Sequence, residues 1–63
     1  MTPTEFRTAR EATGLTVNAL AAWLGISRST VLRYGSGELL VPVQTAMLLD
    51  MLAAGEIPGR FRP

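Results

Sequence analysis

The stretch that decides the fold is GLTVNALAAWLGISRSTVLRYGSG, from Gly14 to Gly37. It contains two short runs with apolar residues at helical spacing, separated by Gly25. Each run follows a hydroxyl residue that can act as an N-cap. We therefore expect one helix over Val17–Leu24 and a second over Arg28–Tyr34, joined by a tight turn.

Small and apolar side chains fall where two crossing helices need them. Ala21 is small at the expected crossing point, and Gly25 suits a turn with a positive φ angle. Ile26 precedes the cap Ser27 and Val31 follows at the fourth helical position, the pairing of a hydrophobic staple. The spacing predicts a helix-turn-helix, the motif that places its second helix in the major groove of DNA. The apolar contacts of the pair are expected from Leu20, Leu24, Ile26, Val31 and Tyr34.

Helices are also predicted on both sides of this pair. The segment TPTE from Thr2 fits a capping box and starts a helix that ends near Thr13, with Phe6 and Ala9 on its inner face. A loop leads to Pro42, and a further helix is predicted over 43–54. Residues 1–54 are expected to form one compact all-α domain of four helices, or five if the tail is helical. The tail, residues 55–63, is expected to be irregular and disordered, with extension over DNA or across a dimer as the alternative.

Composition argues against several classes of function. The 63 residues include no cysteine and no histidine, and the five acidic residues are scattered. We therefore expect no metal site, no cofactor, no small-molecule ligand and no enzymatic activity. The first ten residues do not form a signal peptide and no apolar run reaches membrane-spanning length, so a cytoplasmic protein without a membrane partner is expected.

Charge points weakly to nucleic acid. The net charge is only +1, but no acidic residue occurs from Ala12 to Gly37. All six basic residues are arginine, which suits bidentate contacts to guanine or phosphate. Codon bias in a GC-rich genome explains the absence of lysine equally well.

The stretch Gly14–Gly37, with FRTARE before it and the predicted helix after Pro42, resembles the lambda repressor-like, or Xre-type, family of DNA-binding domains. The resemblance extends to Ala54. It implies a compact helical bundle that regulates transcription as a dimer on a two-fold symmetric operator. It also implies that Arg28, Ser29 and Arg33 read bases.

The predicted third helix supports that assignment on physical grounds. Val31 and Tyr34 point inward, which leaves the residues Arg28, Ser29, Leu32 and Arg33 on or near the outer surface. The arginines can each donate two hydrogen bonds to guanine, and the leucine can touch a thymine methyl group. The competing interpretation is that these arginines are ordinary solvated charges.

Phosphate contacts are expected around the start of the second helix, where free amides and the helix dipole favour an anion. Thr30 has two interpretations: it reaches a base or a phosphate, or it supports the capped first turn. Ser36 is expected to reach phosphate from beyond the third helix. The phosphate candidates are Thr16, Asn18, Thr30, Ser36 and Arg10.

Two positions depart from the family pattern. Val17 stands where relatives usually carry a glutamine that binds phosphate. Gly35 stands where they often carry a glutamate that pairs with the arginine of the first helix, so Arg10 is left to pair with Glu38, to meet phosphate or to be solvated. The loop over 38–41 has no basic residue, which predicts weak binding by a single copy and a shallow salt dependence.

The predicted fourth helix is apolar nearly all round, which indicates burial on more than one side. One stripe, Thr45, Leu48, Leu49 and Leu52, is expected to cover the core. The second is expected to form a homodimer interface: Val43, Met47 and Met51, with Leu39 and Leu40. The alternative is that a small core uses both stripes. Trp23 is expected at the core edge, with an interface or the DNA backbone as alternatives.

Together these patterns predict a sequence-specific transcriptional regulator, more specifically a repressor, that binds palindromic double-stranded DNA as a homodimer. A rival hypothesis keeps the fold but not the DNA. In that case the chain is an antitoxin-like or inhibitory protein-interaction module that uses loop 39–41 and the fourth helix.

Overall fold

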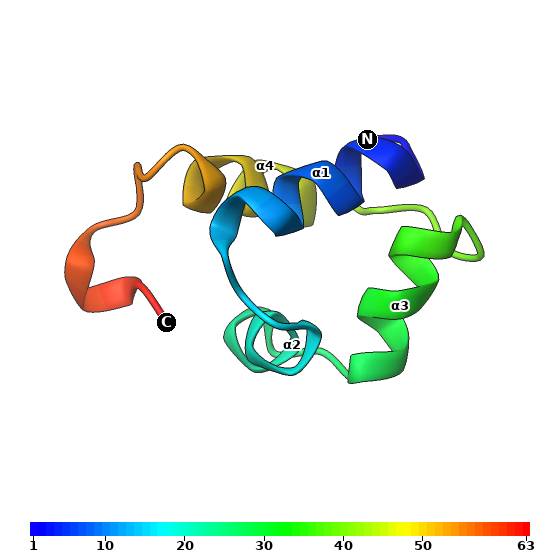
Figure 1. Ribbon diagram of the computed structural model, residues 1–63, viewed down its shortest axis with the longest axis horizontal. Coiled ribbons are helices and arrows are strands. Elements are labelled where there is room, and N and C mark those ends of the chain that lie inside the picture. Colours follow the sequence, from blue (N-terminus) through cyan, green and yellow to red (C-terminus); the bar gives the residue numbers. More distant parts are fainter.

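The computed structural model describes all 63 residues and contains helices but no strand. In Figure 1, α1 and α4 lie side by side along one edge, α2 lies across from them, and α3 closes one end. The predicted all-α fold is confirmed. Its elements are α1 (Pro3–Thr13), α2 (Val17–Leu24), α3 (Arg28–Ser36), α4 (Val43–Ala53) and the short 3₁₀ helix η1 (Gly59–Phe61).

The first three helices begin at hydroxyl N-caps and end at glycines in the left-handed region. At α1 the predicted capping box is complete: Glu5 N donates to Thr2 Oγ1 at 3.1 Å, and Thr2 N donates to Glu5 Oε1 at 2.7 Å. The hydrogen bond from the Thr2 backbone also holds the pKa of the Glu5 carboxyl below its ordinary value. The predicted caps Thr16 and Ser27 likewise start α2 and α3. Local side-chain chemistry thus sets where these helices start.

One hydrophobic core joins the four helices. The rings of Phe6 from α1 and Tyr34 from α3 meet edge to face, with centroids 5.5 Å apart. The predicted inner residues Ala9, Leu24 and Ile26 are partly buried against the core. The core's fully buried members are Phe6, Leu20, Ala21, Val31, Tyr34 and Leu49.

Helix α3 is longer than expected. The sequence predicts an end at Tyr34 because two glycines follow, but Gly35 is helical and the helix ends at Ser36, with Gly37 as its C-cap at φ 87°. A Cβ at Gly35 would lie only 3.4 Å from Cγ of Arg7, and the Arg7 guanidinium donates to the Gly35 carbonyl oxygen. The contact with α1 therefore accompanies the two additional helical residues, Gly35 and Ser36, which intrinsic propensity argues against.

Helix α4 turns most of its predicted inner stripe toward the core, since Leu49 is buried and Thr45 and Leu52 are partly buried. Leu49 is fully buried, and Ala46 and Ala53, one turn away on either side, are partly buried. The assignment of Leu48 to the core is wrong, since 43% of that residue is exposed. Because residues three and four apart share one helix face, a buried face that contains 46, 49 and 53 turns Leu48 toward solvent.

The tail, residues 55–63, lies against the rest of the domain through several contacts. Ile57 is buried, η1 follows it, and Trp23 Nε1 donates to the Phe61 carbonyl oxygen at 2.6 Å. Arg62 donates from Nε to Ile57 O and from Nη2 to Gly55 O, each at 2.7 Å. Trp23 does pack at the core edge as predicted, and it also anchors the returning chain.

Candidate nucleic-acid interface

The pair α2 and α3 forms a supported unit. Ala19 N donates to Thr16 Oγ1 at 3.1 Å at the start of α2, and Gly25 leaves that helix at φ 72°. Ile26 N then donates to Ala21 O at 3.0 Å, which fastens the turn to α2. Ala21 is buried at the helix crossing, as its size predicts. The turn is therefore fastened to the end of α2 by a backbone hydrogen bond, and it determines the direction in which α3 leaves.

Helix α3 separates its side chains into two faces. Val31 and Tyr34 are buried in the core, while Leu32 is 46% exposed. The expected base-reading residues all lie on the exposed side: Arg28, Ser29, Leu32 and Arg33. Their side chains therefore leave a polar and cationic edge with one apolar residue, the mixture that reads base edges in a major groove.

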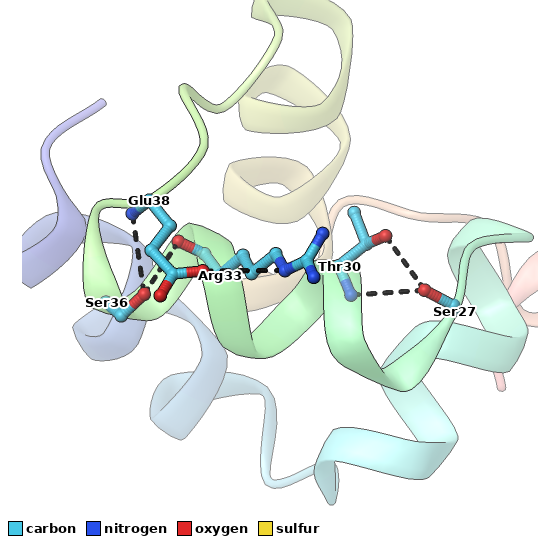
Figure 2. Close-up of polar contacts among 5 residues, drawn as sticks. All are labelled: Ser27, Thr30, Arg33, Ser36 and Glu38. Atoms are coloured by element: carbon cyan, nitrogen blue, oxygen red, sulfur yellow. Dashed lines mark hydrogen bonds and ion pairs between the residues drawn. The ribbon is translucent and has the colours of Figure 1, made fainter.

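Of the two arginines expected to read bases, Arg33 has an ion-pair partner and Arg28 has none. Its Nε lies 3.5 Å from Oε2 of Glu38, in the loop that follows α3 (Figure 2). The side chains of Arg33 and Glu38 are 57% and 69% exposed. The hypothesis that Arg10 pairs with Glu38 is wrong, because Glu38 faces α3 rather than α1.

The hydroxyl residues of α3 already have local partners. The Thr30 and Ser27 hydroxyls share a hydrogen bond of 2.9 Å, and Thr30 N donates to Ser27 Oγ at 3.1 Å (Figure 2). Of the two interpretations of Thr30, support of the capped turn is the one that the contacts display. Ser36 Oγ donates to Arg33 O at 3.2 Å. Each of these hydroxyl groups already makes a hydrogen bond within α3 and its cap, and each can still accept another.

The other phosphate candidates lie near the start of α2. Thr16 caps that helix, and Asn18 is exposed on its first turn. Arg10 is partly buried and Nη1 donates to the Leu15 carbonyl oxygen at 3.4 Å, so it packs on the segment leading to α2. Sequence reasoning missed Arg7, which bonds Gly35 O and donates to Thr4 Oγ1 at 3.3 Å.

No local signal identifies Arg7, because its partner Gly35 is 28 residues away. Arg7 and Arg10 both line a shallow hollow of about 260 Å³ between α1, the start of α2 and the outer side of α3. Val17 and Leu32 make part of it apolar. At the start of α2 the hollow is therefore lined by an apolar side chain, and two guanidinium groups border it.

A second exposed surface lies on α4 and the loop before it. Leu40 is 92% exposed, and a nearly apolar hollow of about 330 Å³ is lined by Gln44, Met47, Leu48 and Met51. We name the exposed apolar residues here the α4 face. They are the five predicted interface residues together with Leu48: Leu39, Leu40, Val43, Met47, Leu48 and Met51. The structure leaves all of them accessible to a partner.

Nothing in the chain resembles a metal centre, since no group of three acidic side chains comes together. None of the helices is both long and apolar enough to cross a bilayer. The hydroxyl side-chain contacts described above lie at the starts of the helices and along α3.

Comparison with known proteins agrees with this architecture. A family model described as a helix-turn-helix domain matches residues 4–57, which includes all four α-helices and Ile57. Neither the curated proteins nor the solved structures gave a match. The match is consistent with the resemblance to Xre-type domains, and the helix-turn-helix is a DNA-binding motif whose role is typically not enzymatic. The chain belongs to the helix-turn-helix domain family.

Proposed function

We propose that this protein is a sequence-specific transcriptional regulator, acting as a repressor, that binds a palindromic operator as a homodimer with α3 in the major groove. The observation that carries the proposal is the two-sided character of α3. Val31 and Tyr34 are buried while Arg28 and Arg33 are exposed. A helix with one buried and one exposed face can lie in the major groove while its buried residues stay packed in the core.

The chemistry of each exposed residue suggests a role at the bases. Arg28 and Arg33 each carry a planar fork of donors that matches O6 and N7 of guanine. Leu32 offers an apolar surface to a thymine methyl group, and Ser29 can donate or accept. These four residues are the base-reading set of the proposal.

Backbone contacts would hold this set in register. We assign them to Thr16 and Asn18 at the start of α2, to Thr30 and Ser36 on α3, and to Arg10. The exposed amides of the first turn of α2 add a site for one phosphate. Few of these groups are cationic, so we expect one copy to bind weakly and the salt dependence to be shallow.

A second copy would compensate for this weak binding. The α4 face supports the homodimer, because it consists of exposed apolar residues, three of which line one hollow, on a small domain. Two copies related by a two-fold axis would place their α3 helices about 34 Å apart, one turn of DNA. We assign residues 1–54 to the DNA-binding domain and a cytoplasmic location to the protein, where operator DNA would be met.

The proposal is tested by first selecting bound sequences from a random pool of duplexes and then measuring Arg33→Ala on the selected site. We expect a loss of about 1–3 kcal/mol and relaxed base choice at one position per half-site. Arg60→Ala removes the same charge from the tail and serves as the control. If Arg33→Ala binds selected and scrambled duplexes as the parent does, the base-reading assignment is refuted.

One observation favours a second function. The α4 face would also suit a protein partner, as in an antitoxin-like or inhibitory interaction module that does not use DNA. Titration with random-sequence duplex at low salt separates the two functions, because only a DNA-binding protein should show association that weakens as salt rises.

A further inference from the structure

We propose that Glu38 is a positioning residue, which orients Arg33 for reading one base and thereby contributes to the specificity of α3. The inference rests on the proposed function, since it requires Arg33 to meet DNA. The observation behind it is the ion pair between Arg33 Nε and Glu38 Oε2, which are 3.5 Å apart at the C-terminal end of α3 (Figure 2).

Glu38 is attached to the end of α3 by its neighbours. The carbonyl oxygen of Arg33 accepts hydrogen bonds from Gly37 N at 3.0 Å, from Leu39 N at 3.3 Å and from Ser36 Oγ at 3.2 Å. Glu38 N itself donates to Ser36 Oγ at 3.4 Å. The loop residues on both sides of Glu38 are thus bonded to the residue whose side chain Glu38 faces.

Glu38 approaches the guanidinium of Arg33 at Nε, which leaves the two terminal nitrogens free. An arginine carries five N–H donors, one of them on Nε. Guanine takes two donors, at O6 and N7, and the two terminal nitrogens can supply both. A carboxylate beside Nε therefore favours conformers that keep Arg33 next to Glu38, without occupying the fork that reads the base. Less side-chain freedom is then lost when DNA binds.

Glu38 also changes what Arg33 attracts. From Ala12 to Gly37 there is no acidic residue, so Glu38 is the first negative charge after the α2–α3 unit. Its charge offsets that of Arg33 and repels nearby phosphates, which lowers binding to any duplex regardless of sequence. Positioning raises the affinity for the selected site alone, whereas the charge lowers the affinity for every duplex, so only positioning changes the ratio of specific to non-specific affinity.

Two variants separate these effects. Glu38→Asp keeps the charge but shortens the side chain, so we expect base preference at the Arg33 position to fall about fivefold, near the low end for one bidentate contact. Binding to a scrambled duplex should stay within about twofold of the parent. Glu38→Gln removes the charge, so the same loss of preference should come with tighter binding to the scrambled duplex. Glu11→Gln is the control for charge alone, and circular dichroism confirms that each variant is folded.

A spectroscopic measurement tests the contact without DNA. In the parent, the Arg33 Nε–H resonance should be shifted relative to that of Arg28, because a carboxylate oxygen lies 3.5 Å from Arg33 Nε and Arg28 has no such partner. Glu38→Gln should remove this difference, and Glu11→Gln should not. Equal behaviour of the two arginines in the parent would overturn the proposal.

The DNA measurements distinguish two failures. If the parent shows no salt-sensitive association with any duplex, the proposed function is wrong and the role of Glu38 falls with it. If the parent binds its selected site specifically and both Glu38 variants keep its base preference, only the role of Glu38 is overturned. The pair would then be an ordinary exposed ion pair, of the kind that contributes little.

Discussion

Truncation of Leu49 to alanine tests how α4 is attached to the rest of the domain. Leu49 is fully buried and is the only α4 residue in the main core cluster, on a helix that packs against α1. Its neighbour Leu48 is 43% exposed and lines the hollow on the α4 face. Two adjacent leucines on one helix therefore have opposite environments.

The expected magnitudes follow from that difference. Removal of a fully buried leucine side chain costs about 2.7–5 kcal/mol, the sum of lost burial and a residual cavity. A chain of 63 residues has a free energy of unfolding of roughly 3–9 kcal/mol, at about 0.05–0.15 kcal/mol per residue. Leu49→Ala should thus remove a third or more of the stability, whereas Leu48→Ala should cost about 1 kcal/mol or less.

Thermal unfolding followed by circular dichroism measures both variants, at several protein concentrations so that any dimer contribution is separated. We expect Leu49→Ala to lower Tm by more than about 10 °C and Leu48→Ala by less than about 8 °C. Sedimentation velocity should show weaker self-association for Leu48→Ala. If Leu48→Ala destabilises as much as Leu49→Ala at a concentration where both are monomeric, the orientation of α4 described above is incorrect.

Four further predictions concern two glycines of α3, the cap of α1 and the tail. Gly35→Ala should raise stability by up to about 1 kcal/mol, because Gly35 is helical and its Cβ would make ordinary contact with the neighbouring arginine. Gly37→Ala should lower the urea midpoint instead, since Gly37 has φ 87° and its Cβ would lie 3.1 Å from a proline ring. The pKa of Glu5 is lowered in the folded state by the hydrogen bond from the N-cap backbone, so its contribution is present above the ordinary value of 4.5 and is lost as the pH falls through the lower folded-state pKa. Glu5→Gln should therefore reduce the difference in urea midpoint between about pH 6 and about pH 3, and an unchanged difference would contradict this role. Deletion of residues 59–63 should shift the fluorescence emission of Trp23, the single tryptophan, to longer wavelength, because its indole N–H loses its partner on the tail. An unchanged emission maximum would show that the tail does not dock in solution.

The local parts of this structure could be predicted from the sequence. Thr2, Thr16 and Ser27 start their helices as predicted, and the inner faces of α1, α2 and α3 are those that the apolar spacing indicates. Caps and helical faces depend on residues three or four apart, so a short segment contains the information. For the same reason the exposure of Arg28 and Arg33 follows once Val31 and Tyr34 are assigned to the core.

Helix α4 shows where the sequence ceases to determine the structure. Its residues are apolar on nearly every side, so the pattern separates an inner from an outer stripe but does not indicate on which side of their boundary Leu48 lies. Packing against α1 selects the side with Leu49 and leaves Leu48 outside. Because Leu48 is as apolar as its buried neighbours, only packing against the neighbouring helix decides that it stays outside the core.

The remaining features join residues that are distant along the chain. Arg7 reaches Gly35, 28 residues away, where α3 extends beyond its predicted end, and Trp23 reaches Phe61, 38 residues away, which docks the tail. The ion pair of Arg33 with Glu38 likewise depends on the path of the loop after α3. The sequence by itself determined where the first three helices begin and which faces they bury, because those depend on neighbours within one turn. Tertiary structure alone decided how far α3 runs, how α4 is turned and where the tail lies, because each depends on which distant surface the folded chain brings into contact.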